Sequence, residues 1–334
     1  TKGAENARIL ITDQLSTICM ILRNASFSEA NARILASNPF LRRFFADMLW
    51  AVFLDHEKFV FERKRLNFRK DIAITLSNIA HLMPFHSSVD GFLLLILILS
   101  FGEPKKNSGS LRSDELSYNE YSLTWGKYQS FGVDVLSKLL STEQSTKNIM
   151  RLLFSFSSAT RDDSLSKDEL LTKKLVDAYC KGDQYKLLND VVSFLLSVIP
   201  FEQINETSSL LYSMTPLISQ SITSLLLIVD QVCDEKSVNE YTLKKNMPLI
   251  WLTTAENYGY KLRSLGKLYN DISGDTNELS KANGNSVMEN MEFKKLAPLI
   301  GSSCLKLVNL MIDKALEIDE KVKTNDKDEI ASKT

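Results

Sequence analysis

The sequence predicts an all-α fold, arranged as a solenoid of roughly six irregular helical repeats. Three observations lead to this prediction: glycine and proline are scarce, helix-start signals recur along the chain, and one Leu-rich pattern returns at a coarse period. Only 12 glycines and 7 prolines occur in 334 residues, whereas strand-rich folds need many turns that use these residues. With 44% hydrophobic and 24% charged residues, the chain can bury a sizeable core.

Helix-start signals are the most local of these observations. Asn38 before Pro39 places an N-cap ahead of a proline at the first helical position, so a helix is expected to begin there. Its apolar residues share one broad face: Phe40, Leu41, Phe44, Phe45, Met48, Leu49, Val52 and Phe53. Ser26 and Ser166 each stand three residues before a glutamate, which is the capping-box pattern. The apolar run 92–99 is shorter than the ~20 residues that span a bilayer, and it predicts a helix buried on all sides.

The repeating pattern is an apolar helix that ends in Leu-x-Asn and a small residue. The two clear copies are centred on Asn24 and Asn78. Looser copies are centred on Lys138, Ser197, Thr253 and Asn309. Their steps of about 54 to 60 residues are longer than the ~40 to 47 residues of armadillo and HEAT repeats. The sequence therefore predicts an armadillo/HEAT-like solenoid, and the alternative is an irregular bundle whose Leu-rich helices resemble one another by chance.

One continuous helical-repeat domain is expected over residues 1–318. Polar stretches at 103–119 and 270–290 predict loops within it, and the charged residues 319–334 predict a disordered tail because little there can pack. The chain begins with Thr1 rather than Met, so we expect a piece of a longer protein.

A solenoid of this kind lines a concave surface with its innermost helices, and such surfaces bind segments of other proteins. The predicted partner-binding residues on these helices are Asn24, Asn78, Lys138 and Trp251. An asparagine amide can donate to and accept from a partner backbone. The alternative is that Asn24 and Asn78 only terminate their helices, because asparagine tolerates the left-handed conformation there.

A basic cluster is the second predicted partner-binding feature. It comprises Arg63, Lys64 and Arg65, followed by Arg69 and Lys70, and phenylalanines are interleaved with it. One interpretation is a contact patch for acidic protein or, more weakly, for nucleic-acid phosphate. The other is a solvated helix start whose aromatic side chains face the core.

Catalytic and cofactor motifs were sought and not found in the sequence. The three histidines, His56, His81 and His86, have no spacing suited to a zinc site, and no glycine-rich phosphate loop occurs. The four cysteines are far apart and predict buried free thiols: Cys19, Cys180, Cys233 and Cys304. We therefore predict no enzymatic activity and no cofactor. A formal net charge of −1 also gives no general attraction to nucleic acid or membrane.

Several segments together resemble one known family. They are 18–27 (Ile-Cys-Met-Ile-Leu-Arg-Asn-Ala-Ser-Phe), Asn38-Pro39, His56-Glu57, 62–65 (Glu-Arg-Lys-Arg), 76–80 (Leu-Ser-Asn-Ile-Ala) and 135–140 (Val-Leu-Ser-Lys-Leu-Leu). In order and spacing the chain resembles the C-terminal armadillo-like region of the ARID-bearing large subunit of SWI/SNF chromatin-remodelling complexes, in its fungal form. The likeness is most specific over the first 100 or so residues and becomes weaker after Leu140.

The resemblance implies a nuclear scaffold for transcription regulation. In that family this region holds a helical segment of the ATPase subunit and packs against other core subunits, and ATP hydrolysis belongs to the ATPase. The DNA-binding ARID module lies outside this chain, so direct nucleic-acid contact is not expected of it, nor is a small-molecule substrate or a membrane. The alternative function is an armadillo/HEAT-like transport or vesicle-tether adaptor, which would carry more regular inner-helix Trp and Asn residues than the three tryptophans here.

Overall fold

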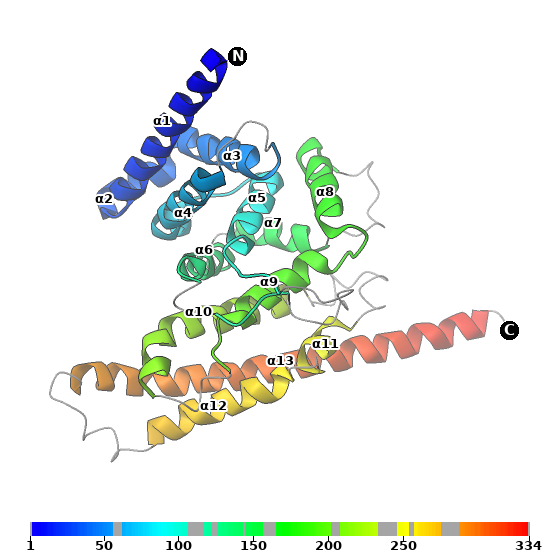
Figure 1. Ribbon diagram of the computed structural model, residues 1–334. Coiled ribbons are helices and arrows are strands. Elements are labelled where there is room, and N and C mark those ends of the chain that lie inside the picture. The colour runs from blue at the N-terminus through cyan, green and yellow to red at the C-terminus, as the bar shows by residue number, and fades with distance from the viewer. Residues whose placement is uncertain are drawn as a thin grey trace. The chain divides into compact units, whose positions relative to one another are not determined.

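The computed structural model describes most of the chain, and its secondary structure is helical (Figure 1). The described residues are 2–55, 62–105, 117–121, 126–142, 144–155, 165–201, 208–232, 246–253, 257–274 and 287–332. Within these ranges no strand forms, apart from one isolated antiparallel bridge between Pro104 and Tyr118. The all-α prediction is therefore confirmed for the described part of the chain.

Thirteen α-helices and one 3₁₀ turn account for the described elements. They are α1 (Lys2–Ser26), α2 (Glu29–Ser37), α3 (Pro39–Phe53), α4 (Glu62–Ile79), η2 (Ala80–Leu82), α5 (Ser88–Leu99), α6 (Gln129–Ser141), α7 (Gln144–Ser155), α8 (Lys167–Cys180), α9 (Lys186–Ser197), α10 (Ser208–Val232), α11 (Met247–Thr253), α12 (Tyr258–Gly274) and α13 (Val287–Ser332).

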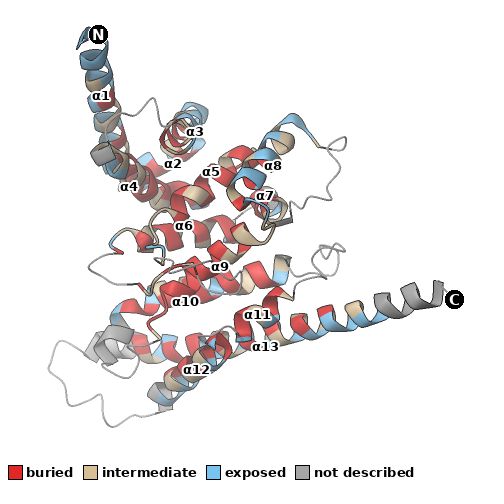
Figure 2. Cartoon of the chain, turned by 45° about the vertical axis from the view of Figure 1, so that its right-hand side comes forward, coloured by how far each residue is buried: buried red, intermediate tan, exposed pale blue. Residues whose placement is uncertain are grey.

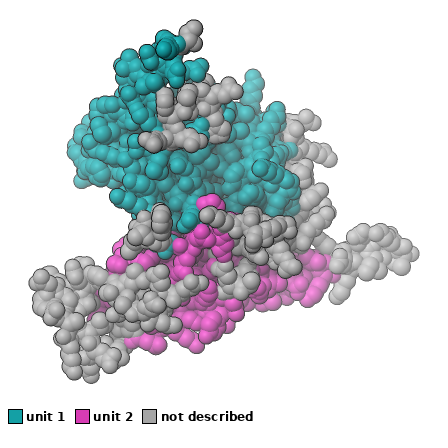
Figure 3. All heavy atoms as spheres, in the orientation of Figure 1, with its two compact units in different colours: residues 1–103, 121–156, 160–191 teal, residues 104–120, 157–159, 192–334 magenta. Residues whose placement is uncertain are grey.

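The chain divides into two compact units (Figure 3). Unit 1 comprises residues 1–103, 121–156 and 160–191, and unit 2 comprises residues 104–120, 157–159 and 192–334. The single helical-repeat domain expected over residues 1–318 stays a prediction. The six-repeat solenoid stays a prediction.

Helix α5 is the centre of unit 1. It packs against α3, α6, α7 and α8, and ten of its twelve residues are buried, as its red colour in Figure 2 shows. Only Asp90 and Ile96 are half-exposed. This confirms the prediction that the run 92–99 is enclosed on all sides, because an apolar helix without a polar face needs neighbours all round it.

The start of α3 follows its sequence signal. The Asn38 side chain accepts a hydrogen bond from the Phe40 backbone N at 2.9 Å, and Pro39 occupies the first helical position. The buried face is narrower than predicted and consists of Leu41, Phe45, Met48, Leu49 and Val52. Phe40 is 82% exposed, although Leu41 in the same first turn is buried.

The two predicted capping boxes have different outcomes. At α8, the Ser166 hydroxyl accepts from the Glu169 backbone N and the Glu169 carboxylate accepts from the Ser166 backbone N. At α2 the prediction is wrong, because Ser28 is the N-cap and makes no side-chain cap. Ser26 instead remains in α1, where its hydroxyl donates to the Arg23 carbonyl at 2.7 Å.

Unit 2 contains helices α10 to α13, of which α12 and α13 lie side by side (Figure 1). Two glycines permit this close approach. A Cβ added to Gly301 would lie 2.5 Å from the Asn270 Oδ1 and 2.8 Å from the Gly266 carbonyl O. Segments 213–231 of α10 and 293–324 of α13 are long and apolar enough to cross a membrane, but they belong to helices that pack against each other.

Boundaries in the C-terminal half differ from those expected. Helix α12 continues to Gly274 and α13 begins at Val287, so helix occupies both ends of the predicted 270–290 loop. Helix α13 then runs to Ser332, through residues for which a disordered tail is expected. Charged residues with high helix propensity, such as Glu320 and Lys321, can extend a helix without any packing. At the predicted 103–119 loop, the Lys105 backbone N donates to the Ser117 carbonyl at 3.0 Å.

The described cysteines agree with the sequence analysis. Cys19, Cys180 and Cys304 are free and buried, and Cys233 lies outside the described residues. Burial raises the pKa of each thiol, and the pKa of Cys19 and of Cys304 reaches about 12.

Candidate partner-binding site

Three of the predicted partner-binding residues lie near the C-terminal ends of neighbouring helices. Asn24 lies in α1, Asn78 in α4 and Lys138 in α6, and α4 packs against both α1 and α6. The recurrent Leu-x-Asn pattern therefore marks three helix ends within unit 1. Trp251 lies in α11 of unit 2.

Polar side chains join α1 to α4. The Asn78 amide donates to the Ser26 hydroxyl at 2.8 Å, and Arg23 pairs with Asp71 at 2.6 Å. The Asp71 side chain is only 5% exposed, so Arg23 neutralises a carboxylate that burial would otherwise make costly. Asp71 is also close enough to help raise the pKa of Cys19, after the larger effect of burial.

A second set of polar contacts joins α4 to α6. The Ser77 hydroxyl donates to Asp134 at 2.6 Å. Lys138 donates to the same carboxylate at 2.6 Å and also to the Ser77 carbonyl. Lys138 is therefore engaged within unit 1, and its predicted role in partner binding stays a proposal.

Asn24 and Asn78 retain unused hydrogen-bonding groups. The Asn24 side-chain Oδ1 accepts two hydrogen bonds from Arg23, while its side-chain Nδ2 donates to no described residue. The Asn78 carbonyl O likewise accepts no hydrogen bond within the described ranges, since only its amide nitrogen is engaged. Because Asn24 is exposed, its amide is accessible to a partner.

Part of the basic cluster in α4 makes contacts with other residues of unit 1. Lys64 pairs with Asp13 of α1, and Arg69 donates to the Ser100 carbonyl at 3.4 Å. Burial, and then the nearby Arg65 charge, lower the pKa of Arg69. The side chain of Arg63 lies outside the described residues. These contacts fit the predicted helix start better than an open basic patch, and Phe68 is fully buried as that interpretation expects.

Trp251 is buried in unit 2 and is 1% exposed. Its neighbours in α11 include buried Met247, Pro248 and Leu252. The indole therefore packs in a core and presents no surface to a partner in this structure.

An exposed apolar surface on α1 was missed by the sequence analysis. Its large members are Leu10, Ile11, Ile18 and Ile21, which are between 42% and 59% exposed, and we call this set the α1 apolar surface. Figure 2 shows much of α1 in the pale blue of exposed residues. The opposite face contains the small buried residues Thr12, Cys19 and Ser26. The three–four spacing of Ile11, Gln14, Ile18 and Ile21 is the signal that could have revealed it.

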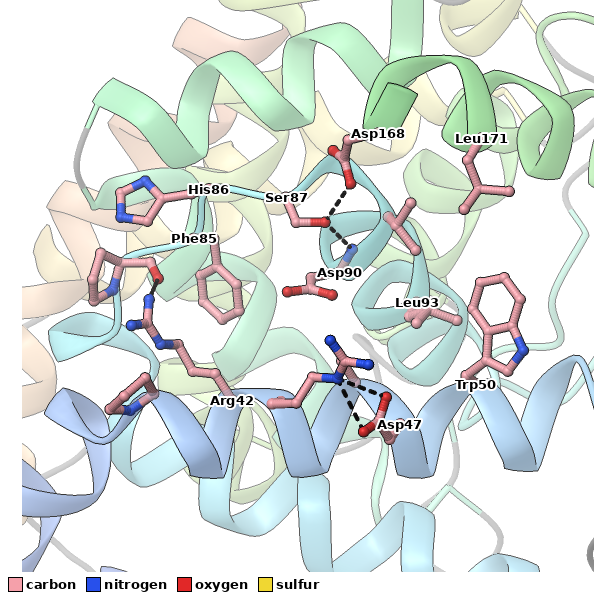
Figure 4. A pocket seen from close by; sticks show the side chains of 15 residues that line it. Arg42, Asp47, Trp50, Phe85, His86, Ser87, Asp90, Leu93, Asp168 and Leu171 are labelled. Carbon is pink, nitrogen blue, oxygen red and sulfur yellow. Dashed lines mark hydrogen bonds and ion pairs between the residues drawn. The ribbon is translucent and has the colours of Figure 1, made fainter. Parts of the chain in front are cut away.

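A pocket of about 500 Å³ also lies within unit 1, between α3, the segment before α5, α5 itself and α8. Figure 4 shows Asp90 projecting into it. Among the described residues, no group of three or more His, Cys, Asp or Glu side chains is placed to hold a metal ion. The chemistry available at these surfaces is hydrogen bonding, charge pairing and apolar contact.

Comparison with known proteins identifies the relationship. No family model matches the chain. The chain is 38% identical, over 95% of its length, to the SWI/SNF chromatin-remodeling complex subunit SWI1 of Saccharomyces cerevisiae, and it spans 27% of that protein. This match confirms the resemblance predicted from the sequence: the chain is a SWI1-type region of the fungal kind.

Proposed function

We propose that this region is a non-catalytic scaffold of a SWI/SNF-type chromatin-remodelling complex in the nucleus. In this role it binds a helical segment of the ATPase subunit and contacts other core subunits. The similarity to the yeast SWI/SNF complex subunit SWI1 supports complex membership. The observation on the chain itself that supports a scaffold is the α1 apolar surface.

The spacing of that surface favours a helical partner. Ile11, Gln14, Ile18 and Ile21 repeat at three and four residues, the pattern by which one helix packs along another. Burying each of the four large aliphatic side chains from its half-exposed state would contribute about 1 kcal/mol. Asn24 lies one turn beyond Ile21, so its unused amide nitrogen can bind polar groups at the end of the same partner helix.

The buried face of α1 makes this surface available. Its three buried residues are small, and the helix is attached by polar contacts such as Arg23–Asp71. Folding of unit 1 therefore leaves the α1 apolar surface exposed. In our proposal Asn78 and Lys138 act mainly by joining α1, α4 and α6, which fixes the position of this surface.

Other functions receive less support. ATP hydrolysis is assigned to the partner subunit, and we propose no catalytic site here. Lys64 is paired with Asp13, and Arg69 is part-buried and donates to the Ser100 carbonyl. Both side chains are thereby engaged within unit 1, so direct nucleic-acid contact is not proposed. We propose no small-molecule substrate and no membrane association.

Affinity capture of the full-length protein with altered α1 tests the proposal. Ile18→Asp together with Ile21→Asp places two charges on the α1 apolar surface, and the expected result is at least a tenfold loss of co-purified ATPase subunit at moderate salt. The matched control is Leu299→Asp with Leu316→Asp, which changes two exposed leucines of α13. Circular dichroism of the isolated chain checks that both variants fold.

Equal ATPase recovery from the two variants would contradict the α1 assignment. Recovery of transport or vesicle proteins in place of chromatin-remodelling subunits would instead favour the adaptor alternative.

A further inference from the structure

The pocket between α3, α5 and α8 in unit 1 contains carboxylates that differ in their hydrogen bonds and ion pairs (Figure 4). Arg43 binds both oxygens of Asp47 at 3.0 Å. Asp168 accepts from the Ser87 hydroxyl at 2.7 Å and from the Ser88 backbone N at 2.6 Å. These two carboxylates are therefore already paired or hydrogen-bonded within the chain.

Asp90 is the exception. Its carboxylate accepts no hydrogen bond from any described residue, and Figure 4 shows it projecting into the pocket. Burial, and then the neighbouring Asp168 charge, raise the pKa of Asp90 to about 6. Its place in the first turn of α5 gives it some stabilisation from the helix N-terminus, but no direct partner.

Apolar and aromatic side chains form one part of the pocket wall around Asp90. Trp50, Leu93 and Leu171 line the pocket, and Leu171 is 41% exposed on α8. The Trp50 indole makes no hydrogen bond or ion pair with the described residues. A ligand that matches this site has an extended apolar stem and a cationic group that donates hydrogen bonds at its end.

We propose that this pocket binds an arginine side chain of a protein partner. The guanidinium pairs with the Asp90 carboxylate, and the aliphatic stem packs against Trp50, Leu93 and Leu171. The complementarity is one of charge and shape, because the unpaired group is a carboxylate and its surroundings suit a methylene chain and a planar cation.

The pocket also contains two arginines and two further carboxylates. Arg42 donates to the Pro84 carbonyl at 2.9 Å, and Arg43 pairs with Asp47. Both arginines lie close enough to lower the pKa of Asp90 in part, but neither forms an ion pair with it among the described contacts. An anionic ligand would be repelled by Asp90 and Asp168. Arginine suits the site better than lysine, because its planar group can contact the Trp50 ring and donate two hydrogen bonds to one carboxylate.

Fluorine NMR of the 334-residue chain, labelled with 5-fluorotryptophan, tests binding directly. The probes are the blocked pentapeptide acetyl-Ala-Ala-Arg-Ala-Ala-amide and its twin with citrulline, which has the same shape without the charge. The arginine peptide should shift the Trp50 resonance, which Trp50→Phe assigns, with about tenfold higher affinity than the citrulline peptide. The buried Trp251 provides an unshifted internal reference. Equal shifts from both peptides, or none from either, would overturn the proposal.

Asp90→Asn is the decisive variant, because it removes the charge and keeps the shape. It should abolish the preference for arginine over citrulline, whereas Asp177→Asn, an exposed acid on α8 outside the pocket, should retain it. Arginine binding to the unaltered chain should weaken as pH falls below about 6, where Asp90 gains a proton. The other titratable or charged groups lining the pocket are Arg42, Arg43, Asp47, His86 and Asp168. A pH dependence that persists in Asp90→Asn would assign the effect to one of them and overturn the role of Asp90.

The assembled complex provides the second measurement. Phenylglyoxal modifies accessible arginines, and mass spectrometry locates the modified sites. One partner arginine should be protected with unaltered protein and should become reactive with Asp90→Asn. If the peptide binds selectively but no partner arginine is protected in the complex, the pocket binds arginine but is unoccupied there. That result would overturn the assignment to a partner. The scaffold proposal depends on α1 and is tested separately, so either proposal can fail alone.

Discussion

Helices α1 and α5 of unit 1 are both rich in large aliphatic residues, yet they use them in opposite ways. In α5, Phe92, Leu95 and Ile98 are at most 2% exposed, and neighbouring helices surround the element. In α1 the buried residues are Thr12, Cys19 and Ser26, while Ile11 and Ile21 are more than half exposed.

The difference shows that apolar content alone does not predict which helix forms the core. Helix α5 is apolar all round, so only enclosure satisfies it. Helix α1 has a polar or small face that fits against α4 and is held there by Arg23–Asp71 and Asn78–Ser26. Its second, aliphatic face stays exposed, and we propose that it binds another molecule, because exposed apolar patches on a folded unit commonly mark interaction sites.

Leu95→Ala should give the largest loss of stability. Leu95 is fully buried in α5, so its removal leaves a cavity, and the free energy of unfolding should fall by about 3 kcal/mol. The same truncation on α1, Ile18→Ala, should change it by about 1 kcal/mol or less, because Ile18 is already 42% exposed. Urea denaturation of both variants measures the contrast. Equal losses would mean that α1 is also part of the core.

Arg23→Ala should have the next largest effect, because it leaves Asp71 buried with only Lys70 nearby, at 3.6 Å. We expect a loss of about 2 kcal/mol, which hydrogen exchange should locate to α1 and α4. The matched control is Arg33→Ala, which removes an exposed ion pair with Glu29 and should cost less than about 0.5 kcal/mol. Uniform acceleration of exchange across unit 1 would argue against a local role for the pair.

Local signals in the sequence predicted local structure well. Asn38 and Pro39 placed the start of α3, the Ser166–Glu169 capping box placed that of α8, and the run 92–99 identified a buried helix. Each of these depends on backbone hydrogen bonds or burial within a few turns. The Leu-x-Asn pattern also marked the ends of α1, α4 and α6, which lie together.

Features that depend on distant neighbours were harder to predict. Ser26 is not a cap because α1 extends through it, and its hydroxyl donates to the Arg23 carbonyl and accepts from the amide of Asn78, 52 residues away. Trp251 matched the repeating sequence pattern, but its packing within unit 2 buries it. Asp90 carries no motif, and its proposed role depends on Asp168 and Trp50, which other helices bring to the same pocket. A sequence pattern could have revealed the α1 apolar surface, but it could not show that no described helix covers it.

The rate of thiol labelling should show the smallest of these differences between α1 and the enclosed core. Cys19 is buried on the α1 face that holds Thr12 and Ser26, and its pKa is raised to about 12, so alkylation at neutral pH requires α1 to detach. Arg23→Ala weakens that attachment and should speed labelling of Cys19 several-fold, while Cys304 of α13, fully buried in unit 2, should label at an unchanged rate. Peptide mapping by mass spectrometry separates the cysteines. Because Cys19 lies on α1, the binding of an ATPase segment over Ile18 and Ile21 should slow its labelling again, and this reversal would distinguish a partner that stabilises α1 from one that binds elsewhere.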